Sequence, residues 1–228
     1  MILVLLGLLL IGAVVVLPGW WVKRVMKQYA QPTDRYPGSG GELARHLLDR
    51  LGLEQVGVEV SDIGDHYDPE ARMVRLSPAN YNDASLTAVT VAAHEVGHAI
   101  QHADAYQPLI WRTRLVQTVQ KFQRLGAVLI LLLPVILLAL KLPAIGVTML
   151  VMGLAALGSG IVVHLATLPT ELDASFKRAL PLLDQGGYLK ANDRKPARTI
   201  LTAAALTYVA ASLMGLLNFW YWLRMLRP

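Results

Sequence analysis

Long apolar stretches alternate with polar segments along this chain. The apolar stretches begin at Ile2 and near Leu125, Pro143 and Ile200, and each approaches the roughly 20 residues that a membrane-spanning helix needs. The second stretch is the shortest, but its polar flank at 118–124 can extend it. Four such runs would be hard to bury in a soluble chain of 228 residues, so the pattern predicts four transmembrane helices.

The longer polar segment, residues 23–124, has a pattern of its own. Apolar positions in 42–51 recur at helical spacing, which predicts a short helix. Residues 56–60 and 73–76 alternate as strands do, so we expect them to pair as a small β-hairpin across a turn rich in Asp and Gly. After a loop, a further helix is expected to begin near Ser85 or Leu86.

The composition supports a membrane protein and removes several kinds of chemistry. Apolar residues make up 54% of the chain and charged residues 16%, below the roughly 25% of a soluble domain. There is no cysteine, which excludes disulfides, zinc ligation by cysteine and cysteine nucleophiles. The net charge of +5 is modest, and Lys and Arg residues near the ends of membrane spans usually reflect the orientation of the chain. No nucleic-acid partner is therefore expected.

The basic residues predict how the chain is oriented. They concentrate in segments 23–124 and 169–198, whereas the turn between the second and third stretches holds only Lys141. By the positive-inside rule, both polar segments lie in the cytoplasm and both termini outside, although Arg224 and Arg227 count against this. The first stretch is not expected to be a signal peptide, because no Lys or Arg precedes its apolar run.

The sequence HEVGH at residues 94–98 carries the candidate chemistry. His94 and His98 are four residues apart, so on a helix both imidazoles stand on one face and can reach one Zn²⁺ ion. Glu95 lies beside them, where it can take a proton from a zinc-bound water and pass it to the leaving amine. The strands before this helix offer an edge to which an extended peptide can add. The motif therefore predicts a zinc-dependent peptidase.

Catalytic zinc usually has three protein ligands, so a third is required. Asp104 follows HEVGH at a metzincin-like distance, but Gln101 stands where that layout needs a turning glycine, and His102 continues along the same straight helix. Glu171 fits better, because the hairpin of the second and third stretches returns it to the side of the membrane that holds HEVGH. The alternative role of Glu171 is that of an acidic helix start capped by Thr170.

Residues 76–101 and 167–180, together with the four spans, resemble the YugP-like family of neutral zinc metallopeptidases of bacterial membranes. The layout is also similar to that of the HtpX and CAAX-prenyl-protease gluzincins. In those proteins an Asp four residues after the Glu ligand commonly supports a zinc-binding His. Here that position is Ser175, with Asp173 nearby, and the supporting role stays open between the two. The resemblance implies zinc ligation by His94, His98 and Glu171, with Glu95 as catalytic base.

The expected fold class is a mainly α integral membrane protein with four transmembrane helices, a zincin-like HExxH helix and a small β-hairpin or sheet. We expect it in the bacterial cytoplasmic membrane, multi-pass, with the site on the cytoplasmic side. The expected boundaries are helices at 1–22, 125–141, 143–168 and 199–223, a zincin-like segment at 23–124, and a Glu-ligand segment at 169–198.

The predicted function is hydrolysis of peptide bonds in protein substrates, such as membrane or misfolded proteins, with the lipid bilayer as the other partner. The alternative is a non-catalytic membrane scaffold whose structural zinc is closed by a fourth protein ligand. A membrane-protein partner or oligomer stays open, as does the substrate. Four further residues also stay open: His164 within the third stretch, and Arg178, Tyr188 and Tyr106 as oxyanion donors.

Overall fold

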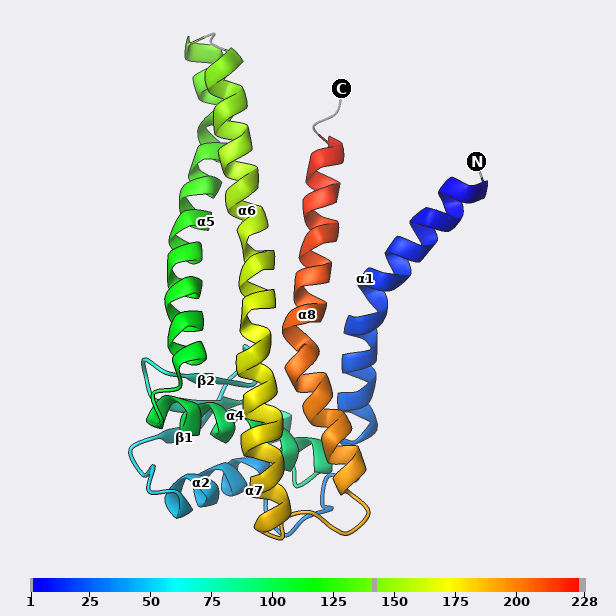
Figure 1. Ribbon diagram of the computed structural model, residues 1–228, viewed down its shortest axis with the longest axis vertical. Coiled ribbons are helices and arrows are strands. Elements are labelled where there is room, and N and C mark those ends of the chain that lie inside the picture. Colours follow the sequence, from blue (N-terminus) through cyan, green and yellow to red (C-terminus); the bar gives the residue numbers. More distant parts are fainter. Residues whose placement is uncertain (1, 141–142, 226–228) are drawn as a thin grey trace. The chain divides into compact units, whose positions relative to one another are not determined.

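The computed structural model describes residues 2–140 and 143–225. The protein is mostly helical, with a small three-stranded sheet (Figure 1). The elements are α1 Ile2–Gln28, α2 Gly40–Arg50, β1 Gly57–Val60, β2 His66–Asp68, β3 Met73–Leu76, α3 Pro78–Asn82, α4 Leu86–Ala103, α5 Gln107–Leu140, α6 Pro143–Leu172, the π-helix η1 Asp173–Ala179, α7 Leu180–Gln185 and α8 Arg194–Met225.

The chain forms two compact units. The first holds the described residues of 1–17, 111–167 and 208–228, and the second holds residues 18–110 and 168–207. The second unit therefore contains α2, the sheet, α4, η1 and α7, together with HEVGH and Glu171.

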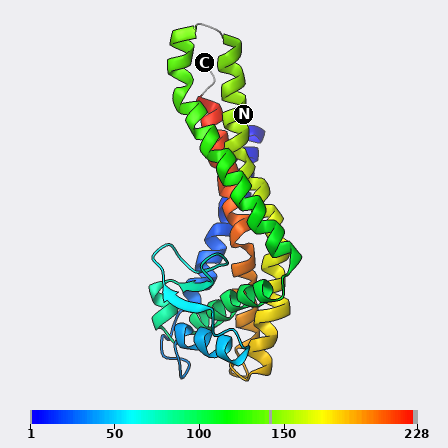
Figure 2. The same cartoon turned by 90° about the vertical axis from the view of Figure 1, so that its left-hand side faces the viewer.

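Helix α4 lies at the centre of the second unit, and every residue from Leu86 to Ala99 is buried. It packs against α2, η1, α3 and the sheet, and Figure 2 shows α2 running alongside it. The Ser85 hydroxyl caps its start by accepting a hydrogen bond from the N–H of Ala88. The predicted start of this helix near Ser85 or Leu86 is confirmed, and the HEVGH side chains it carries are buried.

Helix α2 confirms the helix predicted at 42–51. It begins with a capping box, in which Ser39 and Glu42 satisfy each other's backbone N–H groups. It ends before Gly52, whose φ of +69° is the left-handed conformation that glycine adopts without strain. The loop predicted before α3 and α4 is partly wrong, because residues 78–82 form the short helix α3, with Pro78 in its first turn.

The predicted hairpin between 56–60 and 73–76 is wrong in its pairing. Strands β1 and β3 run parallel, with Gly57 opposite Met73, while β2 pairs antiparallel with the other edge of β3. The segment expected as a turn contains β2, which lets the chain cross over and return. Arg75 on β3 explains this order, because its guanidinium bonds Glu59 on β1 and Asp68 on β2 at 2.6 and 2.5 Å.

The first unit contains a hairpin of α5 and α6, which run side by side in both views (Figures 1 and 2). Gly126 and Gly153 lie where they meet, and a Cβ added to Gly126 would lie 2.4 Å from that of Ala156. Glycine therefore permits this close approach. In the described part of the chain, one helical segment, Gln107–Ile136, is long and apolar enough to cross a membrane; Ala144–Gly160 is a shorter apolar stretch.

Several helix boundaries differ from expectation, and two of them lie in the hairpin of α5 and α6. Helix α5 begins at Gln107, well before the predicted second span, because residues 107–124 contain no proline or glycine after the first turn. Thr170 is not a helix N-cap: α6 continues through Pro169 to Leu172, and Thr170 lies buried inside it. Lys141 lies outside the described residues, and the His164 side chain lies outside those whose surroundings are described.

Candidate functional site

Three buried side chains converge within the second unit. The Nε2 atoms of His94 and His98 lie 3.3 and 3.2 Å from Oε2 of Glu171. One ligand atom from each residue lies within 4.8 Å of the other two, which is a grouping that could hold a metal ion. The structure thus brings Glu171 from the end of α6 onto the helical face that carries both histidines of α4, as the hairpin argument predicted.

A buried amide fixes the orientation of His98. Gln101 donates its Nε2 hydrogens to the carbonyl of Thr170 at 2.9 Å and to a carboxylate oxygen of Asp173 at 2.8 Å. Its Oε1 therefore faces Nδ1 of His98, at 3.0 Å, and an amide oxygen can only accept. The proton of neutral His98 thus sits on Nδ1, and the lone pair of Nε2 is directed toward the centre of the cluster.

A hydroxyl fixes His94 in the same way. Ser175 donates its O–H to the carbonyl of Leu201 at 3.2 Å, so its oxygen is left to accept from Nδ1 of His94 at 3.0 Å. The Nε2 of neutral His94 then also presents a lone pair to the centre. Such support of a histidine through its other nitrogen is usual where histidine binds a metal.

The supporting role left open between Asp173 and Ser175 is thus divided in this structure. Ser175 contacts His94 directly, while Asp173 acts on His98 through Gln101. Asp173 is itself held by the guanidinium of Arg178, with Nε 2.9 Å from Oδ2. This role of Gln101 was not predicted from the sequence. The available signal was its position three residues after His98 in an apolar helix, which suits a polar contact.

A close helix contact makes the convergence possible. Gly97 faces the backbone of η1, and a Cβ at this position would lie 2.7 Å from the carbonyl oxygen of Ala174. A residue without a side chain thus lets α4 pack closely against η1. In η1 the N–H of Leu180 bonds the carbonyl of Ser175, five residues earlier. Such π-turns are rare and occur mostly at functional sites.

The donor set fits a zinc ion. Two imidazole lone pairs and a carboxylate oxygen face one another in a site where all three side chains are buried. An ionised carboxylate beside two lone pairs calls for a cation, and two histidines with one glutamate are a usual set for catalytic zinc.

The other candidate residues have different partners. His102 accepts or donates through Nδ1 to the hydroxyl of Tyr67 at 2.8 Å, and Asp104 forms an ion pair with Arg178. Neither belongs to the cluster. Tyr188 is hydrogen-bonded to His46 at 2.8 Å, and the ring of Tyr106 lies under the guanidinium of Arg178 at 5.6 Å. Glu95 is buried, and the geometry does not single out any of the three proposed oxyanion donors.

Comparison with known proteins agrees with a buried His–His–Glu grouping in a mostly helical chain. The chain belongs to the family described as "Putative neutral zinc metallopeptidase", whose sequence profile matches residues 1–227. It is similar to the "Putative membrane protease YugP" of Bacillus subtilis (strain 168), with 36% identity over 197 residues, which cover 86% of this chain and 84% of that protein. The predicted family resemblance is confirmed. No solved structure matches the chain.

Proposed function

We propose that this protein is a membrane-embedded zinc endopeptidase in which His94, His98 and Glu171 hold the metal. The observation that carries the proposal is the convergence of two imidazole lone pairs and one carboxylate within 4.8 Å. Both imidazoles are fixed through Nδ1, by Ser175 and Gln101, so that Nε2 is the atom offered. Three buried side chains that each offer one ligand atom to a common point suit a cation.

Glu95 is proposed as the general base and acid of the reaction. When bound, zinc would supply Lewis-acid chemistry, which lowers the pKa of water and polarises a peptide carbonyl. Glu95 follows the first ligand directly on α4 and is buried, which suits a carboxylate that must move protons in a dry site. It takes the proton of the attacking water and delivers it to the nitrogen of the leaving amine, so the peptide bond is hydrolysed without net proton change.

A structural zinc site in a non-catalytic scaffold is the competing function. Structural zinc is closed by four protein ligands, whereas catalytic zinc keeps one position open. In the described part of the chain the cluster holds three donors, and the fourth ligands that a scaffold would use, His102 and Asp104, are bonded to Tyr67 and Arg178. This arrangement favours the enzyme.

Two sets of substitutions test the proposal. His94→Ala, His98→Ala and Glu171→Gln should each lose most of the bound zinc, measured by mass spectrometry of the metal in purified protein. Glu95→Gln should keep the zinc and lose about 10²- to 10⁴-fold in the rate of peptide cleavage. Glu54→Gln, an exposed glutamate, is the matched control. Full zinc binding by Glu171→Gln would remove that residue from the ligand set, and full activity of Glu95→Gln would support the scaffold.

The proposal keeps the four spans, the boundaries and the cytoplasmic orientation expected from the sequence. The apolar side chains that α5 exposes after Leu125 support membrane embedding, as does the printed name of the relative as a membrane protease. Its substrates would be proteins or peptides, with membrane or misfolded proteins as the proposed source.

A further inference from the structure

A polar pocket of about 200 Å³ lies against the C-terminal half of α4. Four of its lining residues carry polar side chains of different kinds: the amide of Gln55, the phenol of Tyr67, the guanidinium of Arg72 and the imidazole of His102. Apolar residues complete the lining: Leu53, Val56, Ala99 and Ala103. Among the described residues, none that lines this pocket is acidic.

Arg72 brings a positive charge to this pocket. In the described part of the chain its guanidinium has no ion-pair partner, whereas Arg75 on the same sheet is paired with both Glu59 and Asp68. The remaining oxygen of Asp68 accepts from two backbone N–H groups, so this carboxylate is satisfied without Arg72. Arg72 also has a left-handed backbone, with φ of +51°, a conformation that a glycine would adopt at lower cost.

Tyr67 and His102 form a fixed pair beside this charge. Their Oη and Nδ1 atoms are 2.8 Å apart, and their rings are in contact at 5.8 Å between centroids. Burial raises the pKa of Tyr67 to about 12, so the phenol stays neutral. The hydrogen bond uses Nδ1 of His102 and leaves its Nε2 available to a ligand. The pocket thus combines one unpaired cation with neutral hydrogen-bonding groups.

Helix periodicity puts this pocket next to the proposed catalytic residues. Residues four apart on a helix are neighbours on one face, about one turn or 5.4 Å along the axis. His102 follows the ligand His98 by four residues, and Ala99 follows the base Glu95 by four. A peptide held at the metal would reach the pocket with a side chain or chain end one or two residues from the scissile bond, since extended chain spans about 3.3 Å per residue.

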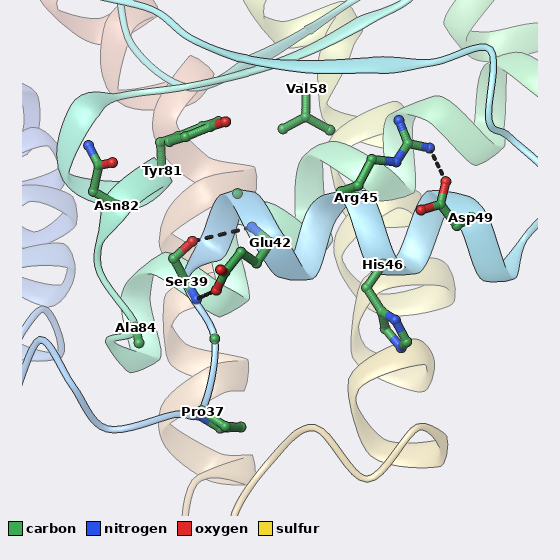
Figure 3. Close-up of a pocket in the computed structure, with 12 residues that line it drawn as sticks. Pro37, Ser39, Glu42, Arg45, His46, Asp49, Val58, Tyr81, Asn82 and Ala84 are labelled. Atoms are coloured by element: carbon green, nitrogen blue, oxygen red, sulfur yellow. Dashed lines mark hydrogen bonds and ion pairs between the residues drawn. The ribbon is translucent and has the colours of Figure 1, made fainter.

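Two larger pockets of the same unit have their charged groups engaged. The first, of about 880 Å³, is lined by α2 and α3, and its charged groups are paired with one another or with the backbone: Glu42 bonds Ser39, and Arg45 bonds Asp49 (Figure 3). The second, of about 470 Å³, has Lys190 placed over the ring of Tyr36 and Glu42 engaged in the capping box. The smaller pocket is therefore the better candidate for binding an anion.

We propose that the pocket of Tyr67, Arg72 and His102 is a substrate subsite that binds a carboxylate close to the scissile bond. This inference rests on the proposed peptidase function and specifies its substrates as peptides with an acidic side chain or a free C-terminus at that distance. Arg72 supplies the charge. The hydrogen-bonded pair of Tyr67 and His102 uses one of its two polar hydrogens internally and supplies the other as a single hydrogen bond that orients the carboxylate.

Matched peptides test this subsite. The zinc-loaded, full-length protein is given peptides that differ only in Glu against Gln near the cleaved bond, and only in a free C-terminus against an amide. In one of these two comparisons, wild type should prefer the peptide with the carboxylate by about tenfold or more in kcat/KM. The comparison that shows the preference tells whether the pocket binds an acidic side chain or a free C-terminus. Arg72→Gln should abolish the preference through KM with little change in kcat. Arg72→Glu should instead favour Lys at the same position.

Controls separate this inference from the proposed function. Arg194→Gln, which removes an exposed arginine paired with Asp184, should keep the wild-type preference. Binding is also measured without turnover, as the affinity of zinc-loaded Glu95→Gln for the same peptides, with and without Arg72→Gln. If wild type cleaves no peptide, the proposed peptidase function is wrong. The binding measurement would still show whether the pocket of Tyr67, Arg72 and His102 binds a carboxylate. Equal binding of acidic and neutral peptides, or no effect of Arg72→Gln, overturns the subsite.

Discussion

Two different residues hold the two histidines of the cluster in the same tautomer. Gln101 does so for His98 through an amide that Asp173 fixes, and Ser175 does so for His94 through a hydroxyl that Leu201 fixes. In both cases the supporting side chain donates its own hydrogen to another group, so the oxygen that faces Nδ1 of the histidine accepts a hydrogen bond. The affinity of the site for metal should therefore depend on residues that do not touch the metal.

We expect Gln101→Ala and Ser175→Ala each to weaken zinc binding by about 10- to 100-fold, because the imidazole then rotates and loses its preferred tautomer. A competition titration with a zinc-chelating dye measures the dissociation constant. Ser159→Ala is the matched control, since that hydroxyl bonds only the carbonyl of Ala156 in its own helix. Unchanged affinity in both variants would show that Nδ1 support is dispensable.

Asp193 should make the stability of the second unit depend on pH in the acidic range. It accepts from Nε of Arg35 at 2.8 Å and from the hydroxyl of Tyr36 at 2.6 Å, which ties the loop before α2 to the start of α8. The hydrogen bond from Arg35 holds the pKa of Asp193 below its ordinary value, against an opposing effect of burial. Because the pKa of Asp193 is lower in the folded than in the unfolded protein, its ionised carboxylate stabilises the fold at pH values above about 4, the ordinary pKa of Asp. This stabilisation is lost as the pH falls through the folded-state pKa.

Asp193→Asn should therefore lower the unfolding free energy at pH 7 by about 1.5–3 kcal/mol, the usual contribution of hydrogen bonds to a charged group. The difference from wild type should shrink as the pH falls below about 4. Thermal unfolding of the zinc-free protein in detergent, followed by circular dichroism, measures both. The exposed Asp62→Asn variant should behave as wild type. A difference that grows in acid would contradict the assignment.

Sequence reasoning worked at this scale where spacing alone determines geometry. Two histidines four apart on a helix must share a face, so the pairing of His94 and His98 could be predicted. The contacts of Gln101 and Ser175 could not, because they depend on side chains that lie about 70 to 80 residues away in sequence. Only the packing of α4 against η1 brings these groups together.

At the scale of the elements, the site depends on how closely α4 approaches η1. The carbonyl of Ala174 occupies the space that a side chain at position 97 would need, because its oxygen would lie 2.7 Å from a Cβ at that position. Glu171 precedes η1 by two residues, so a shift of η1 would move the third donor away from both histidines. Gly97 thus matters for ligand geometry as well as for packing.

Gly97→Ala should lower stability by about 1–3 kcal/mol through overpacking, even though alanine is the better helix former. It should also weaken zinc binding, by roughly tenfold, while leaving all donors present. Gly19→Ala is the control, because a Cβ there meets nothing within 4 Å. Unfolding and zinc titration of both variants decide the matter. Normal zinc affinity in Gly97→Ala would show that η1 can shift without moving Glu171.

Element types were easier to predict than their partners. The helices at α2 and α4 follow from apolar spacing and capping residues. The parallel pairing of β1 with β3 could not be read from alternation, which is the same for parallel and antiparallel neighbours when one face is buried. The π-helix was also missed, since it arises from tertiary packing of a segment whose sequence suits an ordinary helix.

At the scale of the whole molecule, the chain itself connects the proposed membrane spans with the site. Helix α6 continues from the third apolar stretch into the segment that carries Glu171 without a break. On α5, the exposed side chains change along the helix from the cation Lys121 to the apolar residues Leu125, Val128 and Leu131. If the proposed span is correct, this change is where α5 passes from lipid headgroups to hydrocarbon.

Because the sequence contains no cysteine, the accessibility of single introduced cysteines can show which parts of the chain lie in the membrane. Leu131→Cys should resist a membrane-impermeant maleimide in intact cells and in inverted vesicles, because the side chain, 75% exposed in the protein, would face lipid. Ile63→Cys, in a loop where the side chain is 86% exposed, should react in inverted vesicles alone. Detergent should make both variants reactive, which controls for burial by the protein.

These two thiols separate embedding from orientation, because each can fail alone. Reaction of Leu131→Cys in either intact membrane would place α5 in water and remove the second span. Reaction of Ile63→Cys from outside the cell would keep the span but turn the site to the opposite face. The expected pair of results follows from the positive-inside rule, because Lys and Arg residues lie at both ends of the segment that holds HEVGH, next to the first and second apolar stretches. The site would then act on cytoplasmic substrates at the membrane surface.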